Sequence, residues 1–189
     1  MKKSTKRNNQ AFSALSLTRI TRTIYFLLGF YALSIVIFDS GNLITREALI
    51  DRWILFSFVL LINTLAWYFA SQKGSFFHKP SIGIFLITLG LLAFAGFTTY
   101  WERGMASTST IFYVLPLLTI AVLKNRHALI ATATLAAGTY ALSAVKYFND
   151  FFNEGFRIQL WGSILLYSGT IFTCAWLIME IAGLRHDSK

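Results

Sequence analysis

The stretch from Ile82 to Tyr100, IGIFLITLGLLAFAGFTTY, carries no charged residue across 19 consecutive positions. A helix that crosses the roughly 30 Å hydrocarbon core of a bilayer needs about 20 such residues. The length and composition of this stretch therefore predict a transmembrane helix.

Similar apolar stretches lie on both sides of it, and short charged loops separate them. We expect spans at about residues 23–38, 53–70, 82–100, 110–123, 128–147 and 158–183, of which the fourth is the shortest. The predicted fold class is all-α, a polytopic bundle of six transmembrane helices. The predicted division is a basic cytoplasmic tail at residues 1–22, a transmembrane domain at 23–184 and a second cytoplasmic tail at 185–189.

The overall composition supports a membrane protein. The chain has 189 residues, of which 56% are hydrophobic and only 13% charged, whereas soluble domains carry about 25% charged residues. The net charge of +9 comes from basic residues between the spans, and a nucleic-acid-binding protein would need a water-soluble module to carry its basic face. We therefore expect the lipid bilayer as a partner and no nucleic acid.

The distribution of basic residues predicts the orientation. Cytoplasmic loops are enriched in Lys and Arg, and 12 of the 17 basic residues fall on the side that holds both termini. These are Lys2, Lys3, Lys6, Arg7, Arg19, Arg22, Lys73, Lys79, Lys124, Arg126, Arg185 and Lys189. We expect a multi-pass protein of the cytoplasmic membrane with both termini inside. The N-terminal tail is either unstructured up to about Ala11 or a short helix at the membrane surface.

The sequence offers little for catalysis. Cys174, the only cysteine, falls in the middle of the sixth span, while His78, His127 and His186 fall at or beyond the cytoplasmic ends of spans. A thiol nucleophile needs a nearby base, and three scattered histidines do not form a metal site. We expect no enzyme activity, no metal and no cofactor.

Two features within the spans predict helix packing. Asn63 is the strongest polar group at depth, and we expect it to hydrogen-bond a neighbouring helix, a contact of about 1 kcal/mol. Ala133, Ala137 and Ala141 recur every four residues in the fifth span. Such small residues let backbones approach closely, so this helix is expected at the centre of the bundle or at the seam of a homodimer.

The loops on the outer side carry charges of both signs. Short loops at adjacent helix ends can converge into a polar cap for a small zwitterionic or polar ligand, and solvated loops with weak local ion pairs are the alternative. The candidate site residues are Arg46, Glu47, Glu102, Arg103, Asp150 and Glu154.

The chain resembles the multi-span membrane input module that precedes many bacterial sensor histidine kinases. The resemblance lies in six closely spaced helices and in the stretch Phe112–Pro116 followed by the basic turn Lys124–Arg126. His186 and the three residues after it resemble the start of a phospho-acceptor box, but no kinase follows. The resemblance implies a sensory-input protein that has lost its transmitter or works with a separate cytoplasmic signalling chain. A small-solute transporter, or the membrane subunit of one with a transport partner, is the alternative, and it predicts a cavity lined by Asn63.

Overall fold

The computed structural model describes residues 2–71, 80–102, 104, 107–151 and 157–183, and all regular structure within these ranges is helical. The chain forms two compact units, residues 1–90 and 91–189. Helix α3 (Pro80–Trp101) runs through the boundary between them. The prediction of an all-helical fold is confirmed for the described residues.

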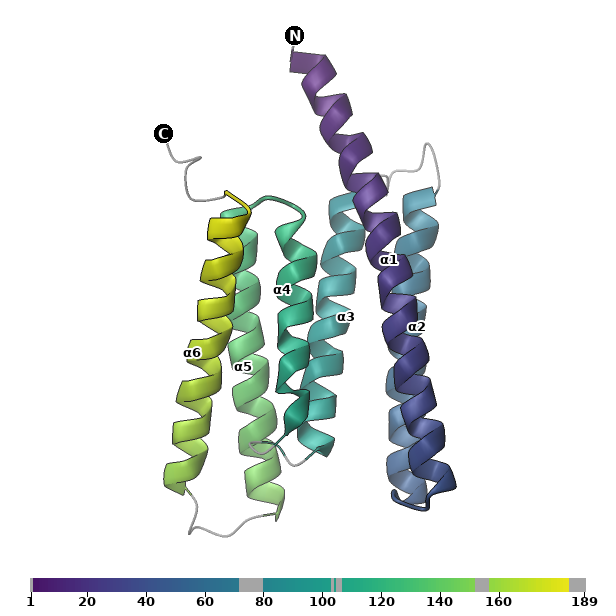
Figure 1. The fold of residues 1–189 in the computed structure, drawn as a ribbon, viewed down its shortest axis with the longest axis vertical. Helices are drawn as coiled ribbons and strands as arrows, with labels where there is room; N and C mark the ends of the chain where they lie inside the picture. The colour runs from purple at the N-terminus through teal and green to yellow at the C-terminus, as the bar shows by residue number, and fades with distance from the viewer. Residues whose placement is uncertain (1, 72–79, 103, 105–106, 152–156, 184–189) are drawn as a thin grey trace. The chain divides into compact units, whose positions relative to one another are not determined.

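The first unit is built on the paired helices α1 (Lys2–Ser40) and α2 (Arg46–Ser71), which lie side by side in Figure 1. Asn42 ends α1 in the left-handed conformation with φ 50°, and the Leu43 amide donates to the Phe38 carbonyl at 2.9 Å. This pattern is a Schellman motif, which satisfies the last carbonyls of a helix and reverses the chain. The reversal brings α2 back along α1.

Close approach of helices holds the first unit together. Leu17, Leu28 and Ile35 of α1 are almost fully buried, as is Ala66 of α2. A Cβ placed on Gly83 at the start of α3 would lie 2.8 Å from the Leu17 side chain. A methyl group at Gly83 would therefore require the end of the Leu17 side chain to move.

Helix α1 begins earlier than expected. The structure places Lys2 in the same continuous helix as the first apolar stretch, so the prediction of an unstructured tail up to Ala11 is wrong for residues 2–11. The tail contains no Gly or Pro, the two residues that most disfavour a helix interior. The helix therefore extends backward from the apolar segment without interruption.

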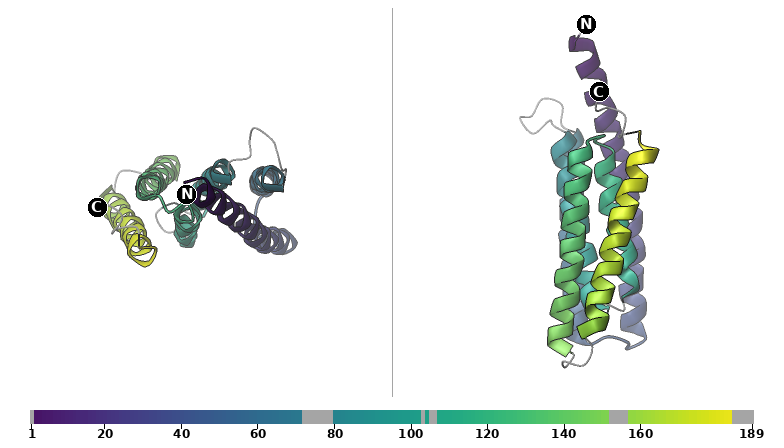
Figure 2. Two further views of the ribbon diagram at one scale, coloured as in Figure 1. Left: turned by 90° about the horizontal axis from the view of Figure 1, so that it is seen from above. Right: turned by 90° about the vertical axis from the view of Figure 1, so that its left-hand side faces the viewer.

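The second unit contains the end of α3, the 3₁₀ helix η2 (Thr108–Tyr113), α4 (Val114–Ala121), α5 (Arg126–Phe151) and α6 (Arg157–Ile181). Helix α4 packs against both α5 and α6 (Figure 2). The core of the second unit includes Phe94, Leu117 and Leu129, each at most 1% exposed. Asn125 caps α5 by accepting hydrogen bonds from the His127 and Ala128 amides.

Five described helical segments are long and apolar enough to cross a membrane, namely residues 16–40, 46–68, 80–101, 126–151 and 158–181. The expected fourth span is a shorter apolar segment, Thr108–Ala121, in which the 3₁₀ turn leads into α4. Pro116 lies in the first turn of α4. A proline is tolerated there because the first amides of a helix have no partner within the helix.

Much apolar surface is exposed, including Ile158 (89%) and Leu165 (79%) on α6.

The small residues of α5 lie partly at the centre of the second unit. Ala133, Ala136 and Ala144 are fully buried, whereas Ala137 and Ala141 are half-buried. Helix α5 packs against both α4 and α6, while its expected position at the centre of the whole bundle stays a prediction. The homodimer seam stays a prediction.

Candidate functional site

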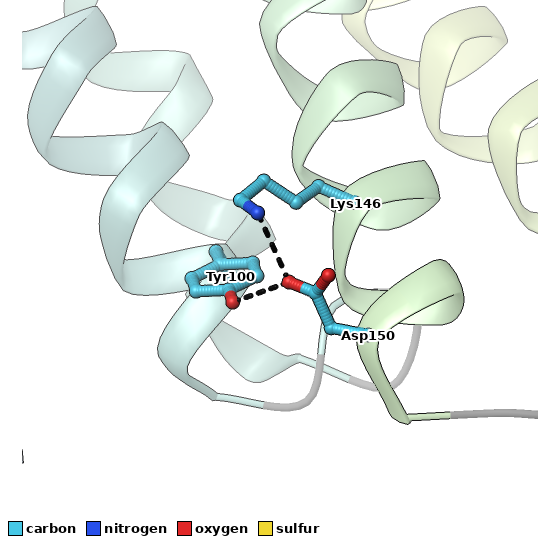
Figure 3. Close-up of polar contacts among 3 residues, drawn as sticks. All are labelled: Tyr100, Lys146 and Asp150. Carbon is cyan, nitrogen blue, oxygen red and sulfur yellow. Dashed lines mark hydrogen bonds and ion pairs between the residues drawn. The ribbon is translucent and has the colours of Figure 1, made fainter.

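Three side chains meet where α3 and α5 end in the second unit. The Tyr100 hydroxyl donates to Asp150 Oδ2 at 2.6 Å, and Lys146 Nζ donates to the same oxygen at 3.1 Å (Figure 3). The Lys146 ammonium also lies 5.5 Å from the centroid of the Tyr100 ring. We call Tyr100, Lys146 and Asp150 the outer polar cluster, after the side of the membrane on which the sequence predicts these helix ends.

The turn that follows α3 packs against α5 beside this cluster. Gly104 has φ +56°, and a Cβ at this position would lie 2.7 Å from Cβ of Tyr147. Only glycine combines this backbone conformation with so close an approach. The Tyr147 ring in turn lies edge-on to the ring of Tyr100, with the two centroids 6.2 Å apart.

Glu102 is held within the same turn. The Ser109 hydroxyl donates to Glu102 Oε2, and the Ser109 amide donates to the Ser107 hydroxyl oxygen at 3.0 Å. Ser107 therefore acts as the N-cap of η2, a role that serine commonly takes. The structure brings the two predicted site residues Glu102 and Asp150 to the same end of the second unit, each with its own local partner.

The other predicted site residues fall elsewhere. Arg46 and Glu47 are exposed in the first turn of α2, in the first unit. The carboxylate of Glu47 suits this position because the start of a helix carries a partial positive charge. Arg103 and Glu154 lie outside the described residues, as do His78, His186 and the C-terminal tail.

The outer polar cluster is accessible from outside the protein. The side chain of Lys146 is 67% exposed and that of Asp150 is 36% exposed. An exposed ion pair adds little to stability because water competes for both charges. The same exposure leaves the carboxylate of Asp150 and the ammonium of Lys146 available to a ligand. No group of three or more potential metal ligands of the His, Cys, Asp or Glu type occurs in the described part of the chain.

Asn63 lies inside the first unit and contacts α1. Its side chain is fully buried, and Nδ2 donates to the Thr21 carbonyl at 3.0 Å. The predicted hydrogen bond to a neighbouring helix is thus confirmed. Asn63 joins α2 to α1, and Thr21 itself is 1% exposed.

The sequence pointed to Asp150 and Glu102 as candidate site residues but not to their hydrogen-bond partners. Lys146 and Asp150 are four residues apart on one helix, a spacing that places them on the same face, so this pair was detectable. Tyr100 is separated from Asp150 by 50 positions, and no local pattern links the two residues. Ser109 was missed because a single serine at the start of a short helix carries no distinctive signal.

The fold and the cluster define a class of protein: an all-helical chain with several long apolar helices of the kind found in membrane proteins. No family model, no curated protein and no solved structure matches the chain.

Proposed function

We propose that this chain is a non-enzymatic integral membrane protein of the cytoplasmic membrane that recognises a small zwitterion at its outer face. Five helices of spanning length and a shorter sixth segment support a six-span arrangement. The excess of Lys and Arg in the loops beside the termini supports cytoplasmic ends. In this orientation the outer polar cluster faces the exterior of the cell.

The arrangement of the cluster is the observation that carries the proposal. An ammonium and a carboxylate lie in contact at 3.1 Å, and the same ammonium lies against an aromatic face. A free amino acid carries one charge of each sign, an ammonium and a carboxylate attached to the same carbon atom. Its ammonium replaces that of Lys146 beside Asp150 and over the Tyr100 ring, while its carboxylate pairs with the released Lys146. Cations bind aromatic faces in this way with a gain of about 0.5–2 kcal/mol.

The position of the cluster supports a sensory role. Asp150 belongs to α5 and Tyr100 to α3, so their hydrogen bond links the outer ends of two helices. A ligand that competes for Asp150 changes this link, and its differential affinity for the linked and unlinked states shifts their populations. The helices transmit the change to the cytoplasmic side, where a separate signalling chain receives it.

Transport through the first unit has weaker support. The alternative function needs Asn63 to line a path for the solute, but its Nδ2 is engaged with the Thr21 carbonyl. The threonines of the long helices mostly donate to carbonyls one turn earlier in their own helices, as Thr88, Thr132 and Thr173 do.

Cysteine labelling tests the orientation. We propose Ser40→Cys at the end of α1 and His127→Cys at the start of α5, two exposed positions, each in a Cys174→Ala background. A membrane-impermeant maleimide should label the first variant in intact cells and the second only after the cells are opened. The reverse pattern, or equal labelling of both, would overturn the proposed orientation.

Thermal unfolding in detergent with each of the free L-amino acids tests recognition. We expect at least one to raise the melting temperature of the wild type, and this rise should disappear in both Lys146→Gln and Asp150→Asn. Asp51→Asn is the matched control, because Asp51 is an exposed carboxylate on α2, and the rise should persist there. A rise that survives both cluster variants but not Asn63→Ala would favour transport, and the absence of any rise would contradict zwitterion recognition.

A further inference from the structure

Two arginines lie on the exposed face of α1, one helical turn apart. Arg19 and Arg22 are both exposed, and residues three apart on a helix are neighbours on one face, with Cβ atoms about 5–6 Å apart. The opposite face of α1 packs inside the first unit, where Leu17, Thr21 and Ile24 are buried. Both guanidinium groups are therefore accessible from outside this unit. We call Arg19 and Arg22 the arginine pair.

The first unit has no carboxylate that can balance the arginine pair. Its acidic residues are Asp39, Glu47 and Asp51, which lie at the end of α1 and in the first turns of α2. A helix rises 1.5 Å per residue, so Arg22 and Asp39 are about 26 Å apart along α1. Charges in physiological salt are screened beyond about 8 Å. The balancing negative charge therefore comes from outside the first unit.

An apolar stripe continues from the arginine pair along the same face of α1. Phe26, Phe30 and Leu33 are exposed, and they follow Arg22 at intervals of four, four and three residues. These intervals keep side chains on one face of a helix. The face thus presents two positive charges followed by an apolar surface, and a phospholipid has an anionic headgroup followed by acyl chains.

The arginine pair lies at the depth where a membrane meets water. The first helical segment of spanning length begins at Ser16, so both arginines belong to its first two turns. Asn63 of α2 donates to the Thr21 carbonyl, and the exposed Trp67 follows Asn63 by one turn. Tryptophan is enriched at the membrane interface. The guanidinium groups are therefore expected at the level of the lipid headgroups.

We propose that the arginine pair and the adjoining face of α1 form a binding site for one anionic phospholipid, such as phosphatidylglycerol. A guanidinium binds a phosphate through two parallel hydrogen bonds, and the acyl chains lie along Phe26 and Phe30. The net negative charge of the lipid balances the arginine pair, which a zwitterionic lipid cannot do. The inference rests on the membrane placement in the proposed function, and it does not depend on recognition of a zwitterion at the outer polar cluster.

Native mass spectrometry of the protein in detergent tests this site. The wild type should bind phosphatidylglycerol in preference to phosphatidylcholine. Arg19→Gln combined with Arg22→Gln should weaken binding of the first phosphatidylglycerol by at least about tenfold, because each arginine near an anionic lipid contributes roughly fivefold. An affinity that is unchanged in this double variant would overturn the proposal.

The matched control removes two arginines from the other end of the first unit. Arg46 and Arg52 lie in the first two turns of α2, so Arg46→Gln combined with Arg52→Gln lowers the net charge by the same amount. This variant should bind phosphatidylglycerol as the wild type does. An equal loss of affinity in both double variants would show attraction by net charge alone, and it would overturn the site.

Two measurements on the wild type cover the case in which a variant does not fold. Phosphatidylglycerol that carries a diazirine on its headgroup should crosslink to α1 beside the arginine pair, and the absence of a crosslink there would contradict the site. Inorganic phosphate should not displace the bound lipid, because it cannot contact the apolar stripe. Displacement by phosphate at the concentration of the lipid would overturn the assignment to a phospholipid.

Two controls separate this inference from the proposed function. Lys146→Gln should abolish the response to amino acids and leave phosphatidylglycerol binding unchanged, because Lys146 belongs to the second unit. Recovery of the wild type in the membrane fraction tests the membrane placement itself. A membrane-bound wild type that binds phosphatidylglycerol no better than phosphatidylcholine would refute the lipid site alone.

Discussion

The hydroxyl of Tyr100 donates a 2.6 Å hydrogen bond to the carboxylate of Asp150, and it thereby joins the end of α3 to the end of α5. The same carboxylate oxygen accepts from Lys146, its neighbour one helical turn earlier. One carboxylate thus combines a contact within a helix with a contact between helices. Only the second of these bears on how the helices are arranged.

Loss of the Tyr100 hydroxyl should weaken the second unit slightly. We expect Tyr100→Phe and Asp150→Asn each to lower the melting temperature, since each weakens a hydrogen bond that involves a charged acceptor. The two residues share one interaction, so the double variant should be little worse than the more damaging single variant. Thermal unfolding of the four proteins measures the coupling, and fully additive losses would show that the hydrogen bond is not formed in solution.

The turn after α3 should not tolerate a side chain at Gly104. In Gly104→Ala the residue must adopt φ +56° with a Cβ, which costs about 1–2 kcal/mol, and this Cβ meets the Tyr147 side chain. Gly138→Ala is the matched control, because nothing lies within 4 Å of a Cβ there. Alanine in an open helical position should stabilise the protein by about 0.5–1 kcal/mol. Denaturant unfolding gives the change in unfolding free energy for Gly104→Ala and for Gly138→Ala. Changes of the same sign would contradict the geometry of the turn.

The contact between α3 and α5 at Gly96 should show a rescue. Gly96→Ala places a methyl group 2.7 Å from Thr139 Cγ2, and overpacking of this kind costs about 1–3 kcal/mol. Thr139→Ser removes that methyl group, so the double variant should recover a substantial part of the lost stability. A double variant as unstable as the sum of the two single variants would mean that the helices do not approach closely at this level.

Asn63 should contribute to the pairing of α1 and α2. Asn63→Ala removes the hydrogen bond to the Thr21 carbonyl and leaves a space, so the unfolding free energy should fall by about 1–2 kcal/mol. Leu61→Ala on the same helix is the control, because Leu61 is exposed and its truncation should change stability by less than about 0.5 kcal/mol. Unfolding in detergent measures the stability of the Asn63→Ala and Leu61→Ala variants. Equal losses of stability in the two variants would show that Asn63 has no special role.

The sequence by itself determined the helical class of the protein. Long uncharged stretches such as Ile82–Tyr100 must satisfy their backbone hydrogen bonds internally when they are placed in an apolar environment, and a helix does so with local contacts alone. The approximate positions of the apolar helical segments followed from composition for the same reason, whereas the early start of α1 at Lys2 did not. The hydrogen bond of Asn63 to another helix was also predictable, because an amide among apolar residues must find a partner.

The tertiary structure alone decided which side chains meet. The hydrogen bond from Tyr100 to Asp150 and the one from Ser143 to the Gly96 carbonyl join positions that are far apart in the sequence. These contacts depend on helix rotation and on close approaches at Gly96 and Gly104. The apolar pattern does not specify helix rotation, because helices that are apolar on all sides have no single face that must be buried.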